Sequence, residues 1–272
     1  MANNERNPVS KALKALTWMA QSPSPDIGVR DLAVGLGVSP SGAHRILTSL
    51  SEDGFVRQIT SSGRYVIGLE MLRVAHLVTA RAPLRDAALK HMRRLVDLCN
   101  ENALMGVYDS GRRQMMFVAT IESSHPLRYV IELNQWVPVH AGATGLAILA
   151  FLEEDERRAV IEDTKLSALT DQTITESYRL EAELEVIRRR GYAITRGQRI
   201  AGAVGLAVPI FGSDGLVVGD ICLTIPQQRF DESSVSQIAK LLLDCAAHVT
   251  TDIGGKPKNY SYPAAERRFK HA

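Results

Sequence analysis

The feature that most constrains the fold is a pair of short segments with helical apolar spacing that meet at Gly37. Residues 29–35 have the spacing of a short helix with its leucine and Ala33 facing inward. Ser39, followed by a proline, then opens another helix to about residue 51, because Ser is a preferred N-cap and Pro is favoured at the first helical position. A small Ala33 lets the two helices approach closely, and Gly37 permits a tight turn between them. The pattern predicts a helix-turn-helix.

The segments on both sides extend this pattern into a winged domain. A helix with apolar residues at three- and four-residue steps begins at Val9 and ends at the run Ser22–Pro25, because proline cannot continue a helix. Residues 55–59 and 64–67 have strand-like composition and are joined by a Thr-Ser-Ser-Gly turn, so they predict a hairpin. We therefore expect a winged helix-turn-helix domain over residues 1–67.

The helix after Gly37 presents a surface that suits the major groove of DNA. Short or basic side chains and one glycine occupy the positions expected to approach base edges: Ser39, Ser41, Gly42, His44, Arg45 and Thr48. Three further arginines are expected to reach phosphates: Arg30, Arg57 and Arg64. The alternative is a small helical bundle whose solvated polar side chains contact other proteins. Residues 1–75 hold eight basic and six acidic side chains, so the predicted geometry, rather than charge, favours double-stranded DNA as the partner.

A linking helix is predicted over residues 68–84, in which Pro83 is expected to end the helix or to mark a break. Its apolar residues recur at three- and four-residue steps: Met71, Val74, Ala75 and Val78. An apolar stripe between two domains suits dimerisation. Packing of the helix against its own domain explains the periodicity equally well.

The rest of the chain predicts one α/β domain over residues 85–255 and a basic, flexible tail over residues 256–272. Helical spacing falls at residues 84–99, 143–152, 153–163, 180–190 and 235–249. Strand-like segments fall at residues 104–108, 115–120, 127–132, 192–196, 205–211 and 216–225. Hairpins outnumber regular β-α-β alternation, so we expect an α+β chain with a mostly antiparallel sheet and helices packed on it.

Composition excludes some classes of protein. The 32 Lys and Arg residues nearly balance the 30 Asp and Glu residues, which argues against coating of nucleic acid or membrane by bulk charge but not against a local basic surface. Three widely spaced cysteines favour reduced thiols in the cytoplasm rather than a disulfide framework. The longest mostly apolar stretch, residues 200–211, is too short to cross a membrane.

Catalytic motifs are scarce. The chain has no G-x-S-x-G, no G-x-x-x-x-G-K and no H-E-x-x-H, so we expect no catalytic residue, no metal and no cofactor. His140, before a Gly-rich run, is either a general base beside an anion-binding helix start or a structural residue, and we favour the structural role. A small-molecule enzyme with an accessory helical domain, and a ligand-gated module that binds proteins, remain alternatives.

The chain resembles the IclR family of bacterial transcriptional regulators from Val9 to about Ile253. Four consecutive segments carry the resemblance: GVSPSGAHRILTSLSEDGFVRQITSSGRYVIGLEMLRVA, WVPVHAGATGLAILAFL, RRRGYAITRGQRIAGAVGLAVPIF and DGLVVGDICLTIP. The resemblance implies a winged helix-turn-helix, a linker helix and a GAF/PAS-like effector-binding domain. It also implies homodimers that often pair into tetramers. The DNA sites it implies are palindromic operators, and the effectors are frequently organic or aromatic acids.

The family's pocket positions carry over one at a time. They fall on the strands before the Gly-rich helix, on its first turn, and on the three strands that follow: Tyr129, Val137, Ala143, Thr144, Thr195, Ala203, Gly205, Cys222 and Thr224. This chain departs from the family where Asp, Cys, Ser and Lys are common, because Thr195, Gly205, Thr224 and Leu146 stand there.

These departures remove a fixed negative charge and place Arg196 and Arg199 nearby. Helix-start N–H groups and threonine hydroxyls suit a carboxylate, so the sequence predicts an organic-acid effector, with aromatic acids among the candidates. The alternative is that both arginines face solvent or pair with acidic residues across a dimer contact.

Overall fold

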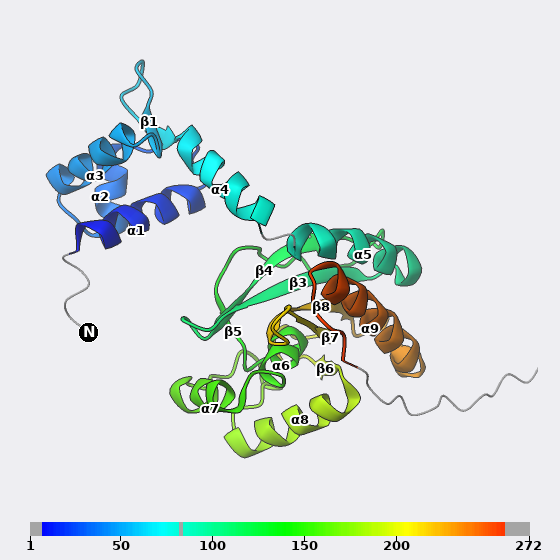
Figure 1. Ribbon diagram of the computed structural model, residues 1–272. Coiled ribbons are helices and arrows are strands. Elements are labelled where there is room, and N and C mark those ends of the chain that lie inside the picture. The colour runs from blue at the N-terminus through cyan, green and yellow to red at the C-terminus, as the bar shows by residue number, and fades with distance from the viewer. Residues whose placement is uncertain (1–6, 82–83, 259–272) are drawn as a thin grey trace, which may run out of the picture. The chain divides into compact units, whose positions relative to one another are not determined.

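The computed structural model describes residues 7–81 and 84–258 and divides into two compact units between residues 82 and 83 (Figure 1). The expected tail falls largely at residues 259–272, outside the described part. Each unit is treated by itself below.

The N-terminal unit is a three-helix cluster with a two-stranded wing and a following helix. Its elements are α1 (Pro8–Gln21), α2 (Val29–Leu36), α3 (Pro40–Glu52), β1 (Val56–Gln58), β2 (Tyr65–Ile67) and α4 (Leu69–Arg81). The strands pair antiparallel, and one core joins them to the first three helices. The predicted winged helix-turn-helix is therefore present.

Glycines set the close approach and the turn between these helices. Gly37 has a φ of +64° directly after α2, a left-handed conformation that favours glycine. A Cβ on Gly35 would lie 2.2 Å from the Trp18 ring of α1, so α1 and α2 pack together only because this position has no side chain. The sequence had indicated Ala33 for this close approach, and Ala33 is buried as well.

The C-terminal unit is an antiparallel sheet with helices on both faces (Figure 1). Its helices are α5 (Leu84–Cys99), α6 (Ala143–Leu149), α7 (Glu154–Asp163), α8 (Ser177–Arg190), the short 3-10 turn η1 (Glu232–Ser234) and α9 (Val235–Asp252). Its strands are β3 (Asn102–Asp109), β4 (Gln114–Ile121), β5 (Val137–Pro138), β6 (Ala193–Arg196), β7 (Ala203–Phe211) and β8 (Val217–Pro226). The strand order is β5-β4-β3-β8-β7-β6, so the α+β fold with an antiparallel sheet is confirmed.

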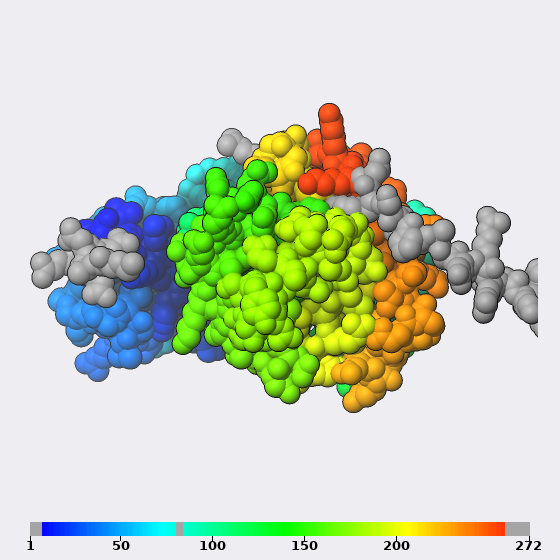
Figure 2. Space-filling view, turned by 90° about the horizontal axis from the view of Figure 1, so that it is seen from below, coloured from blue at the N-terminus to red at the C-terminus, as the bar shows by residue number. Residues whose placement is uncertain are grey.

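Two apolar cores lie on opposite faces of this sheet. One packs α5 and α9 on the sheet, and the other packs α6, α7 and α8 on the reverse face. In Figure 2 the yellow-green residues of α8 and the preceding loop form the near surface of the unit. Alternation along β8 sends Ile221 and Leu223 into the first core and Cys222 into the second. Residue 220 and Thr224 therefore share the α6 face with Cys222.

The expected strand over residues 127–132 is wrong. That segment has no regular structure, and only the two-residue β5 pairs with the edge of β4. Side chains take the backbone groups that a ladder would use: Asn102 donates to the Tyr129 carbonyl and Arg229 to the Leu127 carbonyl. The other expected elements are present, with ends displaced by a few residues. Among them, the helix predicted over residues 143–152 ends at Leu149.

Candidate DNA-binding surface and effector pocket

The exposed face of α3 carries the residues that the sequence assigned to base edges. Five of them are exposed and Gly42 is partly buried: Ser39, Ser41, His44, Arg45 and Thr48. The opposite face holds Ala43, Leu47 and Leu50 in the core, because these positions recur at helical spacing. Ser39 caps the helix by accepting a hydrogen bond from the Gly42 N–H at 3.2 Å. The cap fixes the backbone at the end of α3 expected to approach DNA.

Several cations of the N-terminal unit are exposed to solvent. Among the described residues, Arg30, Arg45 and Arg57 take part in no ion pair, and all three are exposed. Lys11 at the start of α1 lines a groove of about 470 Å³ together with Ser39 and Arg45. The sequence reasoning did not single out Lys11, because only the fold brings α1 beside the start of α3.

Arg64 does not fit its predicted role at a phosphate. Its Nε lies 2.8 Å from Asp26 Oδ1 and its Nη2 lies 2.9 Å from Asp31 Oδ2. The hydrogen bond that Arg64 donates to Asp26 raises the pKa of Arg64. Asp31 also accepts from the Gly28 N–H, and this bond is the main cause of its lowered pKa. Arg64 therefore ties the wing to the start of α2, an arrangement that sequence spacing alone does not reveal.

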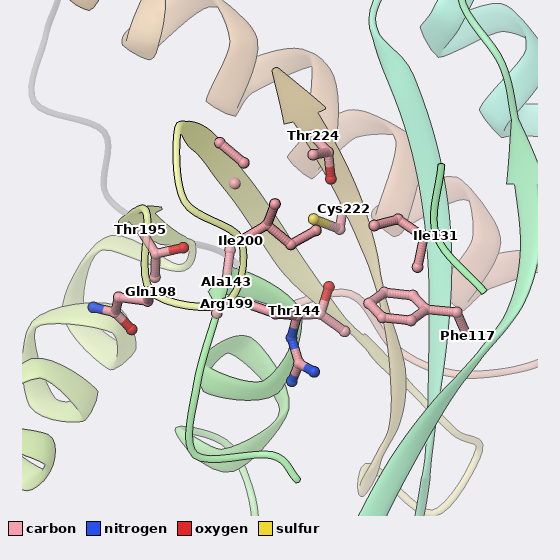
Figure 3. A pocket seen from close by; sticks show the side chains of 13 residues that line it. Phe117, Ile131, Ala143, Thr144, Thr195, Gln198, Arg199, Ile200, Cys222 and Thr224 are labelled. Carbon is pink, nitrogen blue, oxygen red and sulfur yellow. The ribbon is translucent and has the colours of Figure 1, made fainter. Parts of the chain in front are cut away.

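A pocket lies on the α6 face of the sheet, between the first turn of α6 and the loop after β6 (Figure 3). Seven of the nine residues predicted for the effector line it: Ala143, Thr144, Thr195, Ala203, Gly205, Cys222 and Thr224. The register explains the grouping, because Gly205 pairs with both Thr195 and Thr224 across neighbouring strands. The volume of this pocket is about 40 Å³, which is room for roughly three waters.

The two other predicted residues, Tyr129 and Val137, do not line the pocket. The Tyr129 hydroxyl donates to the Ala201 carbonyl at 3.2 Å, so the side chain joins the segment before β5 to the loop on the other side of the pocket. Val137 lies in β5 and packs on the edge of the α6-side core. Both were carried over from the family's pocket positions on the strands before the Gly-rich helix, and the strand expected to contain Tyr129 does not form.

Sequence reasoning missed several lining residues: Phe117, Ile131, Gly142, Gln198 and Ile200. Figure 3 shows the Phe117 ring and Ile131 on the side of the pocket opposite Thr195. Alternation along β4 was a usable signal for Phe117, because Met115, Phe117 and Ala119 are its buried positions.

The two arginines after β6 have different roles. Arg196 is exposed and pairs with Glu232 of the same chain at 2.6 Å, so it adds no free charge to the pocket, and the pairing is not the dimer contact weighed above. Arg199 lines the pocket, and its NH2 donates to the Pro138 and Ala141 carbonyls at 2.7 and 2.8 Å. Its Nε is buried without a partner, and burial lowers its pKa. Arg199 is thus a half-buried cation with no carboxylate partner among the described residues.

A buried carboxyl lies next to the pocket lining. Asp220 Oδ1 accepts from the Gly106 N–H at 3.0 Å, while Oδ2 has no hydrogen-bond partner. Burial raises the pKa of Asp220 to about 8 and that of the neighbouring Cys222 thiol to about 12. At pH 7 both groups are therefore mostly protonated and neutral.

His140 has the geometry of a structural residue. It is completely buried, and its Nε2 donates to the Ser167 carbonyl at 2.9 Å, which anchors the start of α6 to the loop after α7. Burial is the main cause of its lowered pKa. Across the described residues, no three His, Cys, Asp or Glu side chains are placed to hold a metal ion, and no helix is long and apolar enough to span a membrane.

Two family descriptions match the sequence, one for each unit. The IclR helix-turn-helix domain matches residues 8–60, and the C-terminal domain of the bacterial transcriptional regulator IclR matches residues 76–251. The chain belongs to the IclR family. Members of this family are DNA-binding transcriptional regulators, and their C-terminal domain binds small-molecule effectors.

Individual relatives agree with the family assignment. The glycerol operon regulatory protein of Streptomyces griseus is 31% identical over 84% of this chain and 89% of that protein. The transcriptional repressor IclR of Escherichia coli is 26% identical over 93% of this chain and 92% of that protein. An IclR homologue from Microbacterium hydrocarbonoxydans, complexed with 4-hydroxybenzoate, shares the fold at a TM-score of 0.78, with 22% identity over 91% of this chain and 99% of that chain.

Proposed function

We propose that this IclR-family chain binds a small organic acid in the pocket beside α6 and that the acid changes its affinity for an operator. The observation that carries the proposal is Arg199, a half-buried arginine that lines the pocket without a carboxylate partner among the described residues and whose Nε is buried. A ligand carboxylate supplies the missing anion, and a charge-assisted hydrogen bond in a buried site is stronger than a neutral one. Asp220 does not oppose it at pH 7, because burial keeps its carboxyl protonated.

The remaining lining suits an acid with an apolar body. Phe117, Ile131 and Ile200 offer apolar surface, and threonine hydroxyls surround the rest of the pocket. The structural neighbour that holds 4-hydroxybenzoate supports an aromatic acid. An aromatic ring needs more than the 40 Å³ present, so binding must be accompanied by opening of the segment before β5, which Tyr129 fastens to Ala201.

Effector binding changes the affinity for DNA only if the effector binds one arrangement of the protein more tightly than another. We infer that residues 1–67 bind the operator, that residues 68–84 link the two domains, and that residues 85–255 hold the effector. We also infer that the protein acts in the cytoplasm and is not an enzyme. The exposed base-edge residues of α3, together with Arg30 and Arg57, form the DNA-binding surface. The names of relatives support repression.

A homodimer on a palindromic operator is the assembly that we propose, with a dimer of dimers as a further step. Its support is the exposed apolar surface of α4, where Leu69, Leu72 and Val78 are 80%, 66% and 59% exposed on more than one side of the helix. Apolar surface of this kind is stable in water when another element covers it. A two-fold dimer places two copies of α3 on two half-sites.

Isothermal titration calorimetry with the full chain tests the effector proposal. The panel is benzoate, 4-hydroxybenzoate, hexanoate and the neutral benzamide, run on the wild type, Arg199→Gln and the control Arg196→Gln. We expect at least one acid to bind, with affinity reduced about tenfold or more in Arg199→Gln and unchanged in the control. Binding of benzamide alone, or equal binding by wild type and Arg199→Gln, contradicts the proposal.

A further inference from the structure

A second cavity lies at the other end of the β7–β8 hairpin from the effector pocket. The effector pocket uses the pair Gly205 and Thr224, whereas this cavity surrounds the turn that connects Phe211 to Val217. Its volume is about 390 Å³. Apolar and aromatic side chains form its floor: Tyr108, Phe151, Leu152, Leu216 and Val217. Three carboxylates line it as well: Glu153, Glu156 and Asp214.

Two of these carboxylates lack a compensating cation. Glu156 accepts a hydrogen bond from the Tyr108 hydroxyl at 2.6 Å and has Arg113 Nε at 3.8 Å. Glu153 and Asp214 have no cation within ion-pair distance among the described residues, and both are exposed. The cavity therefore combines an apolar floor with uncompensated negative charge, a combination that favours a cationic and aromatic occupant.

The chain itself already brings a cation to the edge of this cavity. After α9, Gly254 adopts a φ of +80° and Gly255 donates to the Thr250 carbonyl. A Cβ on Gly255 would lie 2.2 Å from the Phe211 carbonyl oxygen, so the chain passes directly against the hairpin. The Lys258 ammonium then lies 4.3 Å from the centre of the Phe211 ring and 5.3 Å from that of Phe151, within cation–π range.

The sequence after Lys258 is rich in cationic and aromatic residues, the side chains that would complement the cavity. Residues 259–272 contain three cations, Arg267, Arg268 and Lys270, against one acid. Three aromatic residues accompany them: Tyr260, Tyr262 and Phe269. Tyr262 follows Lys258 by four residues and so lies no more than about 14 Å from it along the chain. The segment starts at the cavity, complements its charge and carries rings for its floor.

We propose that residues 259–272 dock in this cavity of their own chain. The aromatic rings contact the floor, and the arginines pair with Glu153 and Asp214.

Photo-cross-linking in the full chain tests the proposal. Benzoylphenylalanine replaces Tyr262, and the cross-linked peptides are identified by mass spectrometry after digestion. We expect cross-links to residues 151–156 and 214–218 within one chain. Cross-links between two chains, to added DNA or to other surfaces of the protein contradict it, as does the absence of any cross-link.

A matched pair of charge variants shows whether the carboxylates hold the tail. Glu153→Lys with Asp214→Lys should reduce the cross-link yield by about fivefold, the effect of losing two surface ion pairs. The control, Asp155→Lys with Glu162→Lys, makes the same charge change at exposed α7 positions outside the cavity and should leave the yield unchanged. Equal yields in the two variants overturn the assignment.

Hydrogen exchange gives an independent readout that needs no cross-linker. Residues 151–156 and 214–218 should exchange more slowly in the full chain than in a chain that ends at Lys258. Identical exchange in the two chains contradicts docking. Unchanged exchange in α9 serves as the internal control for folding.

Discussion

Asp220 on β8 and Gly106 on β3 face each other in the sheet, and the Gly106 N–H donates to Asp220 Oδ1 at 3.0 Å. A Cβ at residue 106 would lie 2.3 Å from that oxygen, so the carboxyl occupies the space that the glycine leaves free. The other carboxylate oxygen, completely buried, has no hydrogen-bond partner in the described part of the chain. A charge on it is therefore strongly disfavoured in the folded state.

Asp220→Asn should remove a pH dependence of stability. The pKa of Asp220 is about 8 in the folded state and about 3.9 in the unfolded state. Asp220 is therefore protonated in both states below about pH 4, and there its ionisation does not affect stability. As the pH rises from 4 to 8, the free energy of unfolding of the wild type falls by up to about 1.4 kcal/mol per pH unit, because only the unfolded state ionises freely. Asn keeps an oxygen for Gly106 and does not ionise. Urea unfolding at pH 5 and pH 8, followed by Trp136 fluorescence in a Trp18→Phe background, should show a smaller loss in Asp220→Asn, and equal losses would contradict this.

The same carboxyl should make effector binding depend on pH. Because Asp220 adjoins the pocket residues Thr144 and Cys222, its ionisation above about pH 8 repels an anionic ligand. We expect the affinity for the best acid of the calorimetric panel to fall between pH 7 and pH 9 in the wild type. In Asp220→Asn the affinity should stay nearly constant, and a parallel fall in both proteins would assign the pH effect to another group.

Gly35→Ala should destabilise the N-terminal unit by about 1–3 kcal/mol, because the added methyl overlaps the Trp18 ring. Operator affinity should fall with it, since α2 positions α3. The second substitution Trp18→Leu should recover part of the lost stability by making room for the methyl. Thermal unfolding measured by circular dichroism checks both variants, and a Gly35→Ala protein as stable as the wild type would show that the ring moves freely.

Arg45→Ala should weaken specific operator binding by about 1–3 kcal/mol, because Arg45 is exposed on α3 and has no ion-pair partner among the described residues. Effector binding should persist. Arg73→Ala is the control, because Arg73 is already paired with Glu70 on α4. Fluorescence anisotropy with the operator, the segment of DNA upstream of the coding sequence, measures both. Unchanged affinity in Arg45→Ala contradicts the proposed role of α3.

Substitutions of the two wing arginines, Arg57 and Arg64, should affect the salt dependence of DNA binding differently. Arg57→Ala should reduce the slope of log affinity against log salt by about 1, as expected for the loss of one phosphate contact. Arg64→Ala should leave the slope unchanged but lower the midpoint of thermal unfolding, because Arg64 is paired with Asp26 and Asp31. A reduced slope in Arg64→Ala alone would restore its predicted role at a phosphate.

Much of the DNA-binding unit was predictable because its information is local. The N-cap at Ser39, the turn at Gly37 and the apolar spacing of α3 are short-range signals, and the structure has each of them. The role of Arg64 was not predictable, because its carboxylate partners lie 38 and 33 residues away in sequence. Only the packing of the wing against α2 brings them together.

The sequence by itself determined the two-part organisation, the helix-turn-helix and most of the strands of the sensor unit, because caps, turns and periodicity act over a few residues. Tertiary structure alone decided which side chains meet. Strand register places Thr195, Gly205 and Thr224 in one row. Packing leaves Arg199 without an anionic partner among the described residues. The side-chain hydrogen bonds of Asn102 and Arg229 replace a predicted strand with an irregular segment. These outcomes depend on contacts between distant residues, which no local pattern records.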